Sequence, residues 1–321
     1  MKKQVWIAAV ALFVGSAALM GQTKEEAANS FNQGAAMASE NPAGAITALE
    51  KAVQLATAVG AEADDVKKQA VEVLPNLYLQ VANNLLKNKD YPAAIKAFDA
   101  TVKAGEKYGN SEVVTKSNDA VAQIFFAQAI AAMKEKNYDE TVVLFDKVLA
   151  IDKENTDAAL YKAEAFRAAG KFDESTAVSE ALIKSATEKG DSVLAGKVKK
   201  SACAAYLAKG FGLYKEKKAA EAISSLEKSL EYGETTDAYN ALVQICNAAK
   251  QYDKTIEAAT KALVLMKSAT PQNKAGMNYQ LAVAWQAKGN VAKACEAYKN
   301  AMYGQYAEQA KYQCETVLKC N

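Results

Sequence analysis

One pattern recurs along most of this chain and limits what it can fold into: a short polar turn is followed by an aromatic or small residue, and then by a helix that opens in the same way each time. Such turns lie at 88–90, 136–137, 170–171, 215–218, 250–251 and 288–290. Between them the apolar residues have helical spacing, only 4 prolines interrupt the chain, and no sustained run alternates as a strand would. We therefore predict an all-α chain built from repeated helix hairpins.

The second helix of each predicted hairpin carries a small residue followed four positions later by a larger one. The clearest pairs are Ala45 with Leu49, Ala94 with Phe98, Ala222 with Leu226 and Ala294 with Tyr298, and weaker pairs begin at Thr141, Ser175 and Thr255. A small residue where two helices cross lets their backbones approach, and the large residue one turn later fills the groove with the next hairpin. The pattern thus predicts hairpins that pack on one another.

These residues resemble the tetratricopeptide repeat, a helix-turn-helix unit of about 34 residues whose second helix has the pattern A-x3-F. The resemblance implies a right-handed α-solenoid of about seven degenerate hairpins over residues 23–303. It leaves residues 304–321 as a capping helix and tail. Because one hairpin cannot bury both of its faces, neighbouring hairpins must stack.

The spacing of the repeats is uneven. The second helices carry their small residue at 45, 94, 141, 175, 222, 255 and 294, and only the steps from 141 to 175 and from 222 to 255 come close to about 34 residues. The longer steps predict either first helices extended by several turns or an extra short helix, for instance over residues 62–72 before Pro75.

The N-terminus has the composition of a secretory signal peptide. Lys2 and Lys3 precede an apolar run from Val5 to Met20, which ends in small residues. We predict a signal over residues 1–21 that is cleaved near 18–22. The alternative is an uncleaved anchor, although the run is shorter than the roughly 20 residues that span a membrane.

Composition argues against most catalysis. Histidine is absent, which removes the commonest general base and every zinc site that needs imidazole. The chain has 39 basic and 37 acidic residues, and Arg167 is its only arginine, so bidentate contacts with phosphate groups are scarce. The run Gly210-Phe211-Gly212 lacks the third glycine of a dinucleotide loop and predicts helix packing instead. We predict no enzyme, no cofactor, no metal and no nucleic-acid partner.

Five cysteines occur, so at least one must be free or paired with another chain. Cys246 falls on the predicted inner side of a helix pair, where a buried apolar side chain is expected. Cys295, Cys314 and Cys320 gather near the C-terminus, where a disulfide would stop the last helices from fraying, and the sequence leaves their pairing open.

The resemblance also implies a binding face. In this family the first helices line a concave surface that contacts an extended or helical partner. The repeat alignment places there Asn76, Asn83, Lys87, Phe126, Ile130, Tyr161, Glu164, Arg167, Phe211, Tyr214, Asn240, Gln244, Asn247, Tyr279 and Gln286. The Asn and Lys clamp that some members use to hold a free C-terminus is incomplete, because Asn83 lacks its basic companions.

We predict from this an exported, non-enzymatic scaffold of the periplasm or outer membrane of a Gram-negative bacterium, such as a member of the Bacteroidetes. It would hold envelope proteins or peptides through shape and amide contacts, without membrane insertion once the signal is cleaved, and could form homo-oligomers. Two alternatives remain: a glycan- or small-ligand-binding protein, since starch-uptake binding proteins contain such repeats, and a structural protein that self-assembles through its terminal cysteines.

Overall fold

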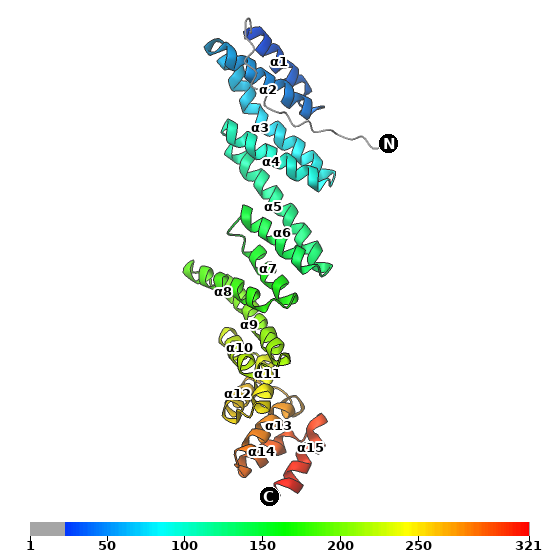
Figure 1. The fold of residues 1–321 in the computed structure, drawn as a ribbon, viewed down its shortest axis with the longest axis vertical. Helices are drawn as coiled ribbons and strands as arrows, with labels where there is room; N and C mark the ends of the chain where they lie inside the picture. The colour runs from blue at the N-terminus through cyan, green and yellow to red at the C-terminus, as the bar shows by residue number, and fades with distance from the viewer. Residues whose placement is uncertain (1–22, 321) are drawn as a thin grey trace, which may run out of the picture. The chain divides into compact units, whose positions relative to one another are not determined.

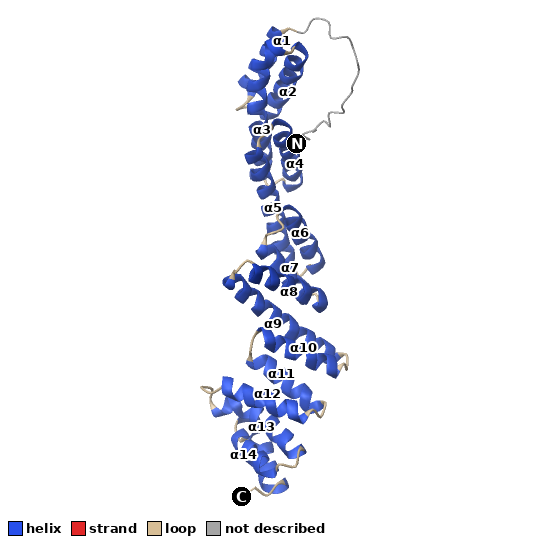
Figure 2. Ribbon diagram, turned by 90° about the vertical axis from the view of Figure 1, so that its left-hand side faces the viewer, coloured by secondary structure: helices blue, strands red, loops and turns tan. Residues whose placement is uncertain are grey.

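The computed structural model describes residues 23–320, which form two compact units, residues 23–124 and 125–320. The described residues form helices joined by short turns, with no strand among them (Figure 2). The predicted all-α repeat fold is confirmed. The predicted signal segment, 1–21, lies outside the described residues. Over residues 23–320 no helix is long and apolar enough to cross a membrane.

In the first unit each helix packs mainly against its neighbours in the chain (Figure 1). The unit contains α1 (Lys24–Met37), α2 (Pro42–Val59), the short 3₁₀ helix η1 (Ala61–Ala63), α3 (Asp64–Lys87) and α4 (Tyr91–Tyr108), and the boundary with the second unit falls inside α5 (Ser111–Lys134). Packing between chain neighbours is the defining property of repeat architectures.

The second unit continues the same alternation of first and second helices. After the end of α5 it contains α6 (Tyr138–Ile151), α7 (Thr156–Ala168), α8 (Phe172–Glu188), α9 (Ser192–Lys215), α10 (Ala219–Tyr232), α11 (Thr236–Ala248), α12 (Tyr252–Leu265), α13 (Pro271–Ala287), α14 (Val291–Ala301), the 3₁₀ helix η2 (Gly304–Tyr306), α15 (Ala307–Tyr312) and the π-helical turn η3 (Gln313–Val317). Helices α1 to α14 therefore make seven hairpins, in which the odd-numbered helix is the first.

The small and large residues that defined the repeat form the core of the hairpins. Both members of all seven pairs are buried, from Ala45 with Leu49 to Ala294 with Tyr298. Glycine permits a very close approach in two hairpins: a Cβ atom at Gly34 of α1 would lie 2.7 Å from Cγ of Leu49, and one at Gly210 of α9 would lie 2.8 Å from Cγ of Leu226. Cys246 is also fully buried, as predicted, and burial raises the pKa of its thiol to about 11.

Extended first helices account for the uneven spacing. The three long steps correspond to α3, α5 and α9, each of 24 residues, whereas the two short steps correspond to α7 and α11, each of 13 residues. The predicted extra helix over 62–72 does not exist as a separate element, because α3 begins at Asp64 and continues through Pro75. Only η1 precedes it.

The polar turns inside the hairpins are chemically alike. Except for the turn between α1 and α2, each contains one residue in the left-handed region, either lysine (Lys89, Lys136, Lys217 and Lys250, with φ of 58°, 62°, 63° and 58°) or glycine (Gly170 and Gly289, with φ of 77° and 74°). The next residue donates its N–H to a carbonyl five residues earlier, as Asn137 does to Ala132 at 2.9 Å. This is the Schellman closure of a helix C-terminus, which fixes the direction of the second helix.

In four of the seven hairpins an acidic residue directly after the second member of the core pair links one hairpin to the next. Glu50 accepts a hydrogen bond from the Tyr78 hydroxyl at 2.8 Å, and Glu180 accepts one from Tyr206 at 2.6 Å. At the same repeat position Asp146 pairs with Lys162 and Glu227 pairs with Lys254. The acidic residues can be recognised in the sequence by their position after the core pair. Their partners cannot, because they lie 16 to 28 residues away and this separation varies with helix length.

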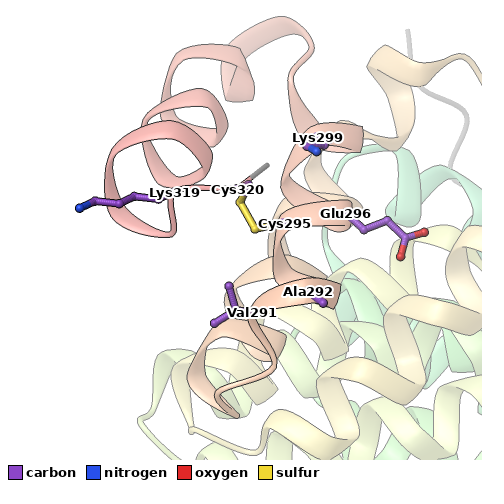
Figure 3. A pocket seen from close by; sticks show the side chains of 7 residues that line it. All are labelled: Val291, Ala292, Cys295, Glu296, Lys299, Lys319 and Cys320. Atoms are coloured by element: carbon purple, nitrogen blue, oxygen red, sulfur yellow. A yellow bond between two sulfur atoms is a disulfide. The ribbon is translucent and has the colours of Figure 1, made fainter.

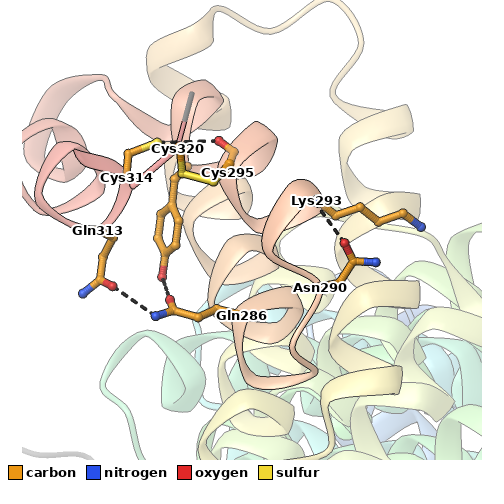
Figure 4. Close-up of a disulfide and its surroundings, with 8 residues drawn as sticks. Gln286, Asn290, Lys293, Cys295, Gln313, Cys314 and Cys320 are labelled. Carbon is orange, nitrogen blue, oxygen red and sulfur yellow. Dashed lines mark hydrogen bonds between the residues drawn. A yellow bond between two sulfur atoms is a disulfide. The ribbon is translucent and has the colours of Figure 1, made fainter. Parts of the chain in front are cut away.

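The C-terminal segment is fastened to α14 by a disulfide between Cys295 and Cys320 (Figure 4). Cys314 lies beside it, buried and free, with its thiol directed at the Cys295 carbonyl oxygen at 3.8 Å. The predicted last helix is shorter than expected: α15 covers six residues and passes directly into η3. The side chains of Tyr298, Ala301 and Ala310 form a buried cluster beneath the segment.

The left-handed lysines generate a first prediction. Replacing Lys136 or Lys217 by glycine should raise the free energy of unfolding by about 1 kcal/mol each, because the lysine Cβ is strained in this conformation. Urea titration followed by circular dichroism measures the change. The matched control, Gly289→Ala, should change the free energy of unfolding by a similar amount in the opposite direction. If both kinds of substitution changed it in the same direction, the proposed role of the turn would be contradicted.

A second prediction concerns the terminal disulfide. Closing a loop of 25 residues restricts the unfolded chain and contributes about 3 kcal/mol to the stability of the C-terminal segment. The variant Cys295→Ser/Cys320→Ser should therefore exchange backbone amide hydrogens faster over residues 304–320, as measured by mass spectrometry, while α11 and α12 remain unchanged. Unchanged exchange over 304–320 would show that packing alone holds the segment.

Candidate functional site

The predicted binding residues all lie on first helices. Asn76, Asn83 and Lys87 are on α3 in the first unit, and the other twelve are on α5, α7, α9, α11 and α13 in the second. Seven are exposed: Asn76, Lys87, Tyr161, Phe211, Tyr214, Asn240 and Gln244. The remaining eight are half-buried, which means that most of them already contact other parts of the protein.

An aromatic cluster joins α5, α6 and α7. The Phe126 ring meets the buried Phe145 edge-on at a centroid distance of 5.3 Å, and Tyr161 stacks on Phe145 at 5.8 Å. Phe126 and Tyr161 also meet edge-to-face at 5.8 Å. Tyr161 nevertheless keeps 41% of its surface exposed. It is therefore an aromatic side chain held by the core and still open to a partner.

Glu164 and Arg167 lie one turn apart on α7 and form an ion pair with each other. Nε of Arg167 donates to the Glu164 carboxylate at 2.8 Å, and its second nitrogen contacts the other carboxylate oxygen. This hydrogen bond is the main reason that the pKa of Arg167 is raised. The only arginine of the chain is thus engaged within its own helix.

The two glycines beside Phe211 decide where its ring points. Gly210 allows α10 to approach α9, and at Gly212 a Cβ atom would lie 2.8 Å from the Phe172 ring of α8. With these neighbours on two sides of α9, the Phe211 side chain is left outward and 44% exposed. Tyr214, one turn later, is 41% exposed. The predicted packing role of the two glycines is confirmed.

Several contacts hold α9 in this orientation. Tyr206 stacks on Tyr232 of α10 at 5.7 Å, and both hydroxyls donate to Glu180 of α8, at 2.6 and 3.0 Å. Desolvation and the Glu180 carboxylate raise the pKa of Tyr232 to about 12, and the Tyr206 hydrogen bond is the largest cause that lowers the pKa of Glu180. Lys209 adds an ion pair with Asp173 of α8.

On α11 and α13 the predicted residues divide between surface and structural roles. Asn240 and Gln244 are exposed. Asn247 instead donates to the backbone oxygen and side-chain oxygen of Gln280 on α13, at 2.9 and 2.7 Å. Its own side-chain oxygen is buried without a hydrogen-bond partner among the described residues.

Tyr279 and Gln286 on α13 belong to the C-terminal packing. The Tyr279 ring contacts Tyr298 at 5.5 Å and Tyr306 at 5.3 Å. Gln286 accepts from the Tyr298 hydroxyl at 2.6 Å and donates to Gln313 at 3.2 Å (Figure 4). These two side chains connect α13 to the terminal segment, so in the second unit the exposed predicted residues lie on α7, α9 and α11.

Two open cavities lie away from this face. One, of about 600 Å³, is bounded by α14 and the Cys295–Cys320 disulfide. Figure 3 shows the charged ends of Glu296 and Lys319 directed away from the disulfide on opposite sides. The other, of about 550 Å³, is lined by residues of the first unit around Tyr108 and Glu112. In residues 23–320 no cluster of three or more histidine, cysteine or acidic residues could hold a metal ion.

Sequence reasoning missed the lysines of α9. Lys197, Lys200 and Lys215 are exposed on the same helix as Phe211 and Tyr214, and Lys197 forms an ion pair with Asp157 of α7 at 2.7 Å. These lysines could have been recognised from the sequence, because residues 192–215 contain lysines and no acidic residue.

Comparison with known proteins agrees with this geometry. Residues 132–193, from the end of α5 to the start of α9, match the model of the tetratricopeptide repeat family. The hairpins and their buried core pairs define an α-helical repeat fold. Residues 132–193 therefore carry the tetratricopeptide repeat, and helices α1 to α14 repeat its helix-hairpin architecture.

Solved structures with a similar arrangement are distant in sequence. MamA has 18% identity and a TM-score of 0.38, over 61% of this chain and 94% of MamA. PilW, a widely conserved type IV pilus biogenesis factor, has 16% identity and a TM-score of 0.35, over 74% and 98%. The C-terminal part of a repeat protein from Cytophaga hutchinsonii has 14% identity and a TM-score of 0.40, over 72% and 98%. No curated protein matches the sequence of the chain.

The Glu180 cluster generates the third prediction. Because the folded-state pKa of Tyr232 is raised from 10.0 to about 12, its contribution to stability is fully present below pH 10 and is lost as pH rises from 10 to 12. The variant Tyr206→Phe/Tyr232→Phe should therefore lose less stability than the wild type across this interval, as measured by thermal unfolding at each pH. Parallel losses in the two proteins would contradict the assignment.

At neutral pH the same cluster is tested by Glu180→Ala. The substitution removes the acceptor of two tyrosine hydroxyls and should lower the free energy of unfolding by about 1 kcal/mol or more. Glu174→Ala, which removes an exposed acid from the same helix, serves as the matched control.

Proposed function

We propose that the protein is a non-enzymatic scaffold that holds protein or peptide partners against the first-helix face of its second unit. This face is defined by the exposed residues Tyr161 of α7, Phe211 and Tyr214 of α9, and Asn240 and Gln244 of α11. The observation that carries the proposal is the exposure of three aromatic rings, each above 40%, on consecutive first helices.

Aromatic side chains on a rigid support are effective anchors for a protein partner. They bury a large area at little cost in side-chain entropy, and they dominate the binding energy of many interfaces. Tyr161 rests on the buried Phe145 ring, and Phe211 lies between two glycines that fix its helix. The amides of Asn240 and Gln244 can donate to and accept from a partner backbone.

We further propose that the partner is an envelope protein and that the scaffold is exported to the periplasm or the periplasmic side of the outer membrane. The signal-like sequence at 1–21 supports export. The Cys295–Cys320 disulfide supports an oxidising compartment, since structural disulfides are rare in the cytosol. The other three cysteines are buried, which disfavours self-assembly through intermolecular disulfides.

The fourth prediction tests the face directly. Tagged full-length protein should recover its partners from the envelope fraction and not from the cytosol, and Phe211→Ala/Tyr214→Ala should reduce that recovery about tenfold or more. Quantitative mass spectrometry of the co-purified proteins measures the change. Tyr312→Ala, which removes a tyrosine that is 57% exposed on α15, is the matched control and should leave recovery unchanged.

Circular dichroism of the double variant must match that of the wild type, because the substituted side chains are on the surface. Full partner recovery by a folded double variant would refute the proposed site. Recovery of the same partners from the cytosol would refute the proposed location.

A further inference from the structure

The charge of α9 differs from that of the rest of the chain. Its 24 residues contain five lysines and no acidic residue, although the whole chain has nearly equal numbers of basic and acidic residues. Lys197 and Lys209 form ion pairs with Asp157 and Asp173 of neighbouring helices. Lys199, Lys200 and Lys215 have no carboxylate partner among residues 23–320. The helix therefore presents positive charge that the described part of the protein does not neutralise.

Two of these lysines lie in line with the exposed apolar residues. On an α-helix, positions separated by 4, 7, 11, 18 and 22 residues return to nearly the same side. Val193, Lys200, Ala204, Phe211 and Lys215 have this spacing, and all five are exposed. Their common side of α9 has an apolar centre, with one lysine on each side of the Ala204–Phe211 segment.

The opposite side of the helix is used for packing. Val198, Ala202 and Ala205 are buried against the neighbouring helices, and Tyr206 is held by Glu180. A helix that needed only to pack within its own repeat array would carry polar residues on its outer side. Instead Val193 is 83% exposed and Phe211 is 44% exposed. The outer side of α9 thus has the composition of a protein interface with a basic border.

We infer that this surface, defined by Val193, Lys200, Ala204, Phe211, Tyr214 and Lys215, binds an acidic amphipathic segment of a protein partner. The apolar side chains of that segment would cover Phe211 and Tyr214. Its carboxylates would pair with Lys200 and Lys215, whose Cα atoms are about 22 Å apart along the helix. The inference rests on the proposed function and adds the chemistry of the partner.

Charge complementarity at such a border determines which partner is accepted more than how tightly it binds. Exposed ion pairs contribute little in isolation, but like charges placed opposite one another are strongly unfavourable. The lysines would therefore select acidic segments and exclude basic ones, while the aromatic rings would supply most of the affinity. A nucleic-acid ligand is disfavoured because the chain has a single arginine, which is already paired with Glu164.

The experiment uses full-length protein and three synthetic helical peptides of about 20 residues with one leucine-rich face. The peptides differ only in the residues that flank this face, which are Glu, Gln or Lys. Binding is measured by fluorescence anisotropy at low salt. The wild type should bind the Glu peptide about tenfold more tightly than the Gln peptide and should bind the Lys peptide least. In the variant Lys200→Glu/Lys215→Glu this order should be reversed.

Two further variants separate the contribution of the aromatic side chains from that of the lysine charges. Phe211→Ala/Tyr214→Ala should weaken binding of the Glu and Gln peptides alike. The matched control Lys153→Glu/Lys311→Glu, which reverses two exposed lysines in other elements, should bind like the wild type. Equal binding of the three peptides by the wild type, no binding of any peptide, or an unchanged order in the Lys200/Lys215 variant would overturn the inference.

Other occupants of the surface give different results. Lysine-dependent binding to vesicles of anionic phospholipid, without a preference among the peptides, would replace the inference with a lipid surface. Dimerisation in sedimentation experiments that is lost in the Phe211/Tyr214 variant would replace it with a second copy of the chain.

Recovery of natural partners distinguishes failure of the inference from failure of the proposed function. If Phe211→Ala/Tyr214→Ala loses the partners and Lys200→Glu/Lys215→Glu retains them, the binding face stands and the acidic chemistry is wrong. If both variants retain the partners, the face itself is wrong.

Discussion

The structure depends on one packing contact, the close approach of two helices at a small residue followed by the insertion of a large side chain one turn later. Both residues are buried in all seven hairpins, even where the pair is reduced to Ser175 and Ser179. At Gly210 the contact is so close that a methyl group would meet Leu226. Because each hairpin buries only part of its apolar surface, this contact also commits neighbouring hairpins to stack.

The same contact shows why so much of the fold could be predicted from the sequence. The small and large residues lie four positions apart, and the turns use lysine or glycine at a fixed place, so both signals are local. The links between hairpins were not predicted. Glu180 accepts a hydrogen bond from Tyr206, which follows it by 26 residues, and Asp146 accepts one from Lys162, which follows it by 16 residues. These sequence separations depend on helix lengths, which the repeat pattern does not determine.

The candidate site was predicted only in outline. The repeat alignment placed every candidate on a first helix, but it could not separate exposed residues from those used for packing. Gln286 and Tyr279 contact the terminal segment, whose short helix and disulfide were not foreseen in detail. The basic border of α9 was overlooked because charge was judged over the whole chain, where lysines elsewhere are balanced by acids.

The central claim is that the outer side of α9 is a binding surface, and site-specific photo-cross-linking tests it most directly. A photoreactive phenylalanine analogue would replace Ala204 on the outer side of α9 or, in a second protein, the exposed Ala177 of α8. The account predicts that a partner is cross-linked in cells through position 204 and not through position 177. Cross-linking at 177 with none at 204 would contradict it.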